Sequence, residues 1–193
     1  ALRVDQYFMR DQADEPALLA HLAEQLRRFE WVVTFNGAAF DLPLIETRFI
    51  MNRMRVGIGA LGSLDLLHAA RRLWRFLLPD RSLTALERDL LGERRHGDVP
   101  SDLIPHIYFQ FLRTGDARRL PPVFEHNCRD IVTTVRLLDR ACRTCRDWRD
   151  DDFHPAEVLG AARAHQLAPD QATAAEAFAR ALRLGLEGDL RAH

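Results

Sequence analysis

The stretch that decides the fold is VVTFNGAAFD, residues 32–41. A short apolar run that ends in Asn36-Gly37 is typical of a buried strand followed by a tight turn. Apolar residues then recur at helical spacing through residues 40–54, which predicts a helix directly after the turn. Asp41 is therefore expected where a central strand gives way to a helix, at the edge where α/β sheets bind their ligands. An acid at this position also stabilises its own helix through the helix dipole, and the local sequence leaves both roles open.

A second acid lies in the longest helical pattern of the chain, which opens after Pro121-Pro122. The predicted apolar stripe of this helix consists of Phe124, Cys128, Ile131, Val135, Leu138, Cys142 and Cys145. His126 and Asp130 are one turn apart and roughly opposite that stripe, so both side chains can reach a single site. A solvated polar face is the alternative interpretation of the same spacing.

Several short segments, taken in chain order, form a wider pattern. They are TFNG at 34–37, FDLP at 40–43, DLLH at 65–68, SLxxL at 82–86 with LG at 91–92, FxxLxTGD at 109–116 and HNxxD at 126–130. Together they resemble the bacterial RNase H-like, DEDD-type exonuclease family related to the proofreading exonuclease domain of family B DNA polymerases. The resemblance covers residues 1–150 and implies an α/β domain, an RNase H-like mixed sheet flanked by helices.

The resemblance also implies a site. Asp41 and Asp130 would be two of four carboxylates that hold a pair of Mg²⁺ or Mn²⁺ ions, which prefer oxygen ligands. Asp65 would either be an auxiliary acid of that site or cap the helix that follows it. His126 would orient or deprotonate the attacking water, because imidazole groups in general titrate near neutral pH. The residues expected to border the 3′-terminal nucleotide are Asn36, Phe40 and Asn127, with Phe40 either a stacking surface or a core residue.

One part of the family pattern is absent from the sequence. The family places Asp-x-Glu on its first strand, whereas residues 2–9, which alternate as a strand, contain no such pair. The first strands are therefore expected to be missing from this chain, or catalysis has been lost. The function implied is a metal-dependent 3′–5′ exonuclease on single-stranded DNA or RNA, with little activity and poor metal retention for this chain alone. The alternative is a non-catalytic nucleic-acid-binding or scaffold module that retains the nuclease fold.

Composition narrows the class of protein without deciding its ligand. The formal net charge is −1, and all 27 basic residues are arginines, which favour bidentate contacts to phosphate. Arginine clusters at 71–75, 94–95 and 118–119 are candidate phosphate contacts, or else solvated surface. No apolar run approaches the ~20 residues of a membrane span. The three cysteines share one predicted helix and are expected to be buried thiols, which fits a reducing cytoplasm.

The remaining motifs receive local interpretations. Gly57–Gly62 spells G-x-G-x-x-G, but a helix precedes it and a strand follows, so a nucleotide fingerprint is rejected in favour of a flexible connection. His96 and Asp98 are predicted to be polar loop residues rather than ligands. After a boundary near residue 150, two Ala-rich helices at 154–166 and 172–186, joined around Pro169, resemble a tetratricopeptide hairpin. The second domain is thus predicted at 154–193, with a possible protein partner.

Overall fold

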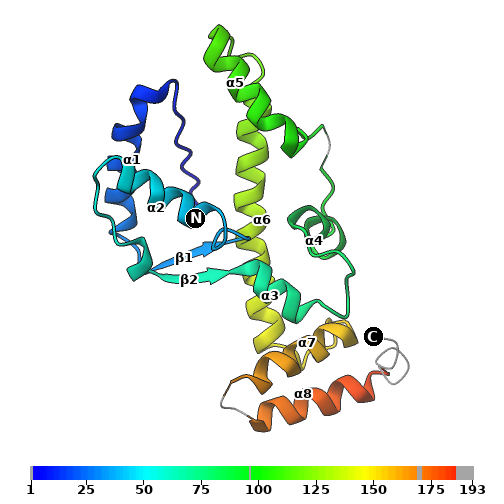
Figure 1. The fold of residues 1–193 in the computed structure, drawn as a ribbon. Helices are drawn as coiled ribbons and strands as arrows, with labels where there is room; N and C mark the ends of the chain where they lie inside the picture. Colours follow the sequence, from blue (N-terminus) through cyan, green and yellow to red (C-terminus); the bar gives the residue numbers. More distant parts are fainter. Residues whose placement is uncertain (1, 96, 169–170, 186–193) are drawn as a thin grey trace. The chain divides into compact units, whose positions relative to one another are not determined.

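The computed structural model describes residues 2–95, 97–168 and 171–185, and Figure 1 shows the fold. Internal packing divides the chain into two units, Ala1–Asp65 with Arg94–Thr133 and Leu66–Glu93 with Thr134–His193. The elements of the first unit are η1 (Gln12–Asp14), α1 (Glu15–Leu26), β1 (Trp31–Thr34), α2 (Asp41–Met51), η2 (Ile58–Ala60), β2 (Gly62–Asp65), η3 (Ser101–Leu103) and α5 (Ile104–Thr114). Those of the second are α3 (Leu66–Leu73), α4 (Leu83–Asp89), α7 (Pro155–Gln166) and α8 (Gln171–Arg183). Helix α6 (Pro121–Arg146) begins in the first unit and ends in the second.

The predicted strand, turn and helix around residues 32–41 are confirmed. Strand β1 pairs in parallel with β2, with Trp31 opposite Gly62 and Thr34 opposite Asp65. The turn after β1 uses a left-handed residue, Asn36 at φ 63°, a conformation that Asn adopts more readily than most residues. Helix α2 then begins at Asp41, which puts that carboxylate in the first helical turn.

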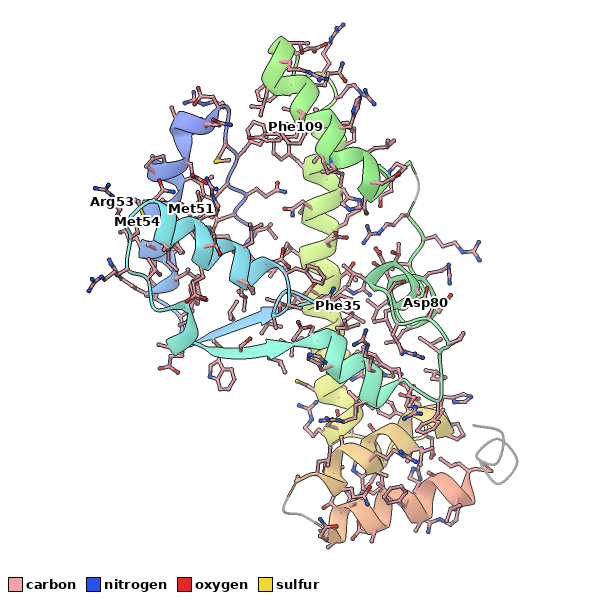
Figure 2. All side chains as sticks on the ribbon, viewed as in Figure 1. Phe35, Met51, Arg53, Met54, Asp80 and Phe109 are labelled. Carbon is pink, nitrogen blue, oxygen red and sulfur yellow. The ribbon has the colours of Figure 1, made fainter. Side chains whose placement is uncertain are left out.

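The core of the first unit lies between α1, α2 and the segment that connects α2 to β2. Its buried members are Leu19, Ala23, Phe49 and Ile58, and Met54 packs against them. Met51, labelled with Met54 in Figure 2, remains 64% exposed at the end of α2. An ion pair between Arg48 and Glu15, 2.5 Å long, joins the two helices beside this core.

The prediction of a strand at residues 2–9 is wrong, and the described residues do not form the predicted mixed sheet. The described residues form one two-stranded parallel sheet, and residues 2–9 adopt no regular secondary structure. Their apolar alternation instead serves helix packing, because the ring of Phe8 lies against Tyr108, Phe111 and Phe124 with centroid separations of 5.8, 5.5 and 5.1 Å. The hydroxyl of Tyr108 also donates a hydrogen bond to the Met9 carbonyl, 3.2 Å away.

The helical hairpin predicted near the C-terminus is confirmed as α7 and α8, within the second unit. Buried alanines let the two helices approach closely, and their core also contains Trp148, Phe153 and Val158. Arg140 of α6 pairs with buried Glu157 of α7 at 2.7 Å, which satisfies an acid that would be costly to bury alone. The predicted join around Pro169 and the end of the second helix at residue 186 lie outside the described residues. The tetratricopeptide resemblance and the domain division at 1–150 and 154–193 stay predictions.

The structure of two shorter segments, the connection between α2 and β2 and the start of α4, is explained by their local sequence. Residues 57–62 contain the short 3₁₀ helix η2 (Ile58–Ala60) and lead into β2 at Gly62, as expected of a connection rather than a nucleotide-binding loop. The Ser82 hydroxyl caps α4 by accepting a hydrogen bond from the Ala85 amide at 3.3 Å. Across the described ranges, no helix combines the length and the apolar character that crossing a membrane requires.

Candidate active site

Four polar side chains, two from the first three turns of α6 and two from the loop before η3, form a closed ring. His126 Nδ1 lies 2.9 Å from Asp98 Oδ1, and His126 Nε2 lies 3.4 Å from Asp130 Oδ2. The Arg95 guanidinium closes the ring, with one nitrogen 3.0 Å from Asp98 Oδ2 and another 2.6 Å from Asp130 Oδ1. The predicted approach of His126 to Asp130 is thus present, and two further residues complete it.

The charges of this ring are compensated within the chain. The Arg95 side chain is only 9% exposed. Its two terminal guanidinium nitrogens contact the carboxylates of Asp98 and Asp130, which the planar geometry of the group allows. Burial alone would raise the pKa of Asp98, but the hydrogen bonds from Arg95 and His126 outweigh burial and lower this pKa. Asp98 is a polar loop residue, as the sequence predicted, and in addition it is an ionised group that orients the imidazole of His126.

The buried face of α6 differs from the predicted one. Ile131 and Val135 of the predicted apolar stripe are 44% and 40% exposed, whereas His126 is 8% exposed. The other buried residues of the helix are Thr133, Leu137, Ala141 and Thr144. The reason lies partly in the ring, because the loop bearing Arg95 and Asp98 covers the side of α6 that carries His126. Cys142, predicted to be a buried thiol, is exposed, while burial raises the pKa of Cys145.

Asp65 holds the turn that precedes α2. Its two carboxylate oxygens accept hydrogen bonds from the backbone amides of Asn36, at 2.7 Å, and Ala38, at 3.0 Å. Gly37 lies between these amides, and a Cβ there would stand 2.6 Å from Thr34 Cβ and 3.0 Å from Asp41 Oδ2. Asp65 thus fixes the turn from which Asp41 projects, and a role as an auxiliary metal ligand stays a prediction.

The residues predicted to border the nucleotide have different surroundings. Phe40 is 67% exposed, so it is not a core residue, and the stacking role stays open to test. Asn36 occupies the left-handed turn described above. The Asn127 side chain accepts a hydrogen bond from Gln6 Nε2 at 2.9 Å, and the same Gln6 group donates to the Phe124 carbonyl. Asn127 therefore has a structural contact, beside any part in binding.

A two-cation centre does not fit these residues as they are arranged. In the part of the chain that the structure describes, no three or more His, Cys, Asp or Glu side chains are gathered so as to hold a metal ion. Asp130 already has a cationic partner in Arg95, and Asp65 accepts two backbone amides. A guanidinium beside a carboxylate offers the charge that a metal ion would otherwise supply, so the two compete for Asp130.

The sequence offered only a weak signal for the residues that complete the ring. Arg95 belongs to a cluster for which the sequence left phosphate contact or solvated surface open, and Asp98 lies 28 residues from the His126 that it contacts. No helical or strand periodicity links a loop to a helix at that separation. His96, predicted to be a polar loop residue, lies outside the described residues.

Comparison with known proteins assigns the fold family. A family model described as the RNase H superfamily matches residues 1–142, which include β1, α2, the ring and most of α6. The chain belongs to the RNase H superfamily.

A curated relative agrees with this span but gives no activity. The chain is 39% identical over 107 residues to a protein of Bacillus subtilis (strain 168) named "Uncharacterized protein YprB". The match covers 55% of this chain and 26% of YprB, so this chain spans about a quarter of that relative. No solved structure matches the chain.

Proposed function

We propose that the protein is a 3′–5′ exonuclease that hydrolyses single-stranded ends of DNA or RNA with Mg²⁺ or Mn²⁺, and that this chain alone supplies an incomplete site with little activity. The observation that carries the proposal is the pair His126 and Asp130, with Nε2 3.4 Å from Oδ2, inside the residues that match the RNase H superfamily. Membership in that superfamily favours phosphodiester hydrolysis as the reaction.

The ring gives His126 a defined task in this proposal. When Nδ1–H donates to Asp98, the imidazole is fixed in orientation and its unprotonated Nε2 is free to accept a proton, 3.4 Å from Asp130 Oδ2. A water that reaches Nε2 can then lose a proton to it, and Asp130 stabilises the imidazolium that forms. Asp130 is 33% exposed at its side chain, which gives solvent access to the edge of an otherwise buried pair.

A second function is favoured by the contact between Arg95 and Asp130. The Arg95 guanidinium lies 2.6 Å from Asp130 Oδ1 and so competes with a metal ion for this carboxylate. This contact favours a nucleic-acid-binding module that retains the nuclease fold and has no catalytic activity. The two functions share a ligand and differ in whether the ligand is cut. A protein partner for α7 and α8 is compatible with either and stays a prediction.

The test uses a 5′-labelled single-stranded DNA and its RNA equivalent, incubated with the chain in Mg²⁺, in Mn²⁺ or in EDTA. The proposal expects a ladder that shortens from the 3′ end, needs the metal, and disappears in Asp41→Asn and Asp130→Asn. Asp139→Asn is the matched control, because Asp139 is an exposed acid on the same helix. Binding without shortening in either metal would contradict the nuclease proposal and favour the second function. Equal activity in all three variants would exclude these carboxylates.

A further inference from the structure

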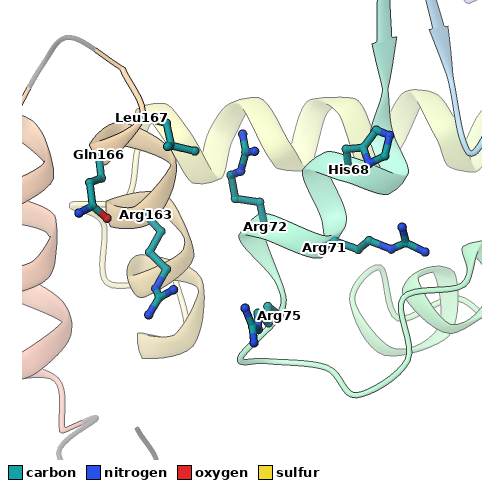
Figure 3. A pocket seen from close by; sticks show the side chains of 7 residues that line it. All are labelled: His68, Arg71, Arg72, Arg75, Arg163, Gln166 and Leu167. Carbon is teal, nitrogen blue, oxygen red and sulfur yellow. The ribbon is translucent and has the colours of Figure 1, made fainter. Parts of the chain in front are cut away.

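A pocket in the second unit gathers arginines from two helices. It has a volume of about 470 Å³, within the range of roughly 300–1,000 Å³ typical of sites for small ligands. Its lining residues are His68, Arg71, Arg72, Arg75, Arg163, Gln166 and Leu167, drawn in Figure 3. The first four belong to α3 and the residues just after it, and the last three belong to α7 and its C-terminal end. We call this pocket the arginine groove.

The arginine groove carries positive charge without a matching acid. No carboxylate lines it, and within the described residues none of its four guanidiniums forms an ion pair. Elsewhere arginines are paired, as Arg48 is with Glu15 and Arg140 with Glu157. The chain as a whole has 27 basic and 28 acidic residues, so this concentration is local and does not follow from the overall charge. An unpaired cluster of this kind attracts anions.

The groove is held in shape by close packing of α3 against α7. Gly160 of α7 faces the backbone of Leu73, and a Cβ at Gly160 would collide with the Leu73 carbonyl. The Phe76 ring lies between two of the arginines, with guanidinium carbons of Arg75 and Arg163 at 5.6 and 4.8 Å from its centroid. These cation–π contacts hold the two guanidinium groups against the ring, while Arg75 and Arg163 as a whole remain exposed.

The arrangement favours several phosphates in a row over one enclosed ion. Arg72 lies on α3 and Arg75 in the turn just after it, and both are on the α7 side of α3 in Figure 3. Arg163 projects from α7, whereas Arg71 extends away from α7. Guanidinium groups spread along an open groove can each bind the oxygens of a different phosphate. A nucleic acid strand presents such a row, and the charge contacts need no particular base sequence.

We propose that the arginine groove binds the sugar–phosphate backbone of single-stranded nucleic acid. The proposal rests on the proposed function only in taking nucleic acid as the ligand, and it does not require that the strand be cut. It assigns a binding site to residues that have no part in the ring of Arg95, Asp98, His126 and Asp130. The groove thus adds an anchor for the backbone that is separate from the candidate active site.

The test measures binding of a fluorescein-labelled single-stranded oligonucleotide to the whole chain by anisotropy, in EDTA, over a series of salt concentrations. The Arg72→Ala/Arg163→Ala variant is expected to bind about tenfold more weakly. The slope of log affinity against log salt should fall by about 1.4, because each lost phosphate contact on a single strand removes about 0.7. The matched control is Arg143→Ala/Arg183→Ala, which removes two exposed arginines outside the groove and should leave the slope unchanged.

The outcomes separate this proposal from the nuclease proposal. Equal losses in the two double variants would overturn the groove as a site, because charge alone would explain binding. Unchanged oligonucleotide binding in Arg72→Ala/Arg163→Ala, with lost binding to phosphatidylserine vesicles, would overturn it in favour of a membrane surface. Loss of binding by the groove variant in a chain that never cuts would support the groove while the nuclease proposal fails. The conservative variant Arg72→Lys/Arg163→Lys should restore most of the salt slope, and circular dichroism checks that each variant is folded.

Discussion

The Arg95 guanidinium lies 2.6 Å from Asp130 Oδ1, so the acid expected to bind a metal ion instead has a cation from its own chain. The same guanidinium holds Asp98, which in turn holds His126. Arg95 thus links its loop to helix α6 and determines how the negative charges of Asp98 and Asp130 are compensated.

Arg95→Ala is expected to destabilise the chain by about 2–3 kcal/mol, because it leaves two partly buried carboxylates without their cation. The matched control is Arg94→Ala, since Arg94 is the exposed neighbour of Arg95 and should cost less than about 0.5 kcal/mol. Urea denaturation gives both free energies of unfolding. Equal values for the two variants would show that the ring contributes nothing to stability.

Manganese binding is expected to be weak in the unaltered chain and stronger in Arg95→Gln. The physical reason is that removing the guanidinium leaves the negative charge of Asp130 less compensated and removes the repulsion between two cations. Titration calorimetry with Mn²⁺ measures the difference, with Arg94→Gln as control. Tight binding of two ions by the unaltered chain would contradict the conclusion that its residues do not fit such a centre.

The contribution of Asp98 to stability should depend on pH. Its pKa is lowered in the folded chain, so the ionised group stabilises the fold above the unfolded pKa of about 3.9. That contribution is lost as the pH falls through the lower, folded pKa. The difference in unfolding free energy between the unaltered chain and Asp98→Asn should therefore be largest near pH 7 and shrink below pH ~4. A difference that is constant over this range would show that the charge of Asp98 plays no part.

Gly37→Ala is expected to destabilise the chain by about 1–3 kcal/mol, because the new methyl group would meet Thr34 and Asp41 at 2.6 and 3.0 Å. Gly59→Ala is the matched control, since its Cβ would have no atom within 4 Å. Thermal unfolding compares the two. A Gly37→Ala chain as stable as the control would mean that the turn before α2 adjusts freely and does not fix Asp41.

Local sequence predicted the elements whose partners are near in the chain. The strand and turn at VVTFNG and the helix that starts at Asp41 are confirmed, because strand propensity, turn chemistry and helical periodicity act over a few residues. The spacing of His126 and Asp130 likewise predicted that they share a site. Short-range sequence patterns were therefore sufficient to predict the segments that carry Asp41, His126 and Asp130.

Features that depend on distant packing were not predictable in the same way. Residues 2–9 alternate as a strand would, yet Phe8 packs against the aromatic rings of α5 and α6. The face of α6 that is buried follows the loop with Arg95 and Asp98, and apolar periodicity alone pointed to Ile131 and Val135 instead. The charge balance at Asp130 depends on a loop residue 35 positions away, a contact that no local pattern encodes.

The most direct test of the account is the single-turnover rate at which the 3′-terminal nucleotide is released from a labelled single strand in Mn²⁺. We expect slow but measurable release by the unaltered chain, because its metal site is incomplete. The rate should fall by about 100-fold or more in His126→Ala and in Asp130→Asn, because each removes a group from the reaction. Asp139→Asn should keep the original rate. Release at the same rate in all four proteins would contradict the central claim that His126 and Asp130 form the active site.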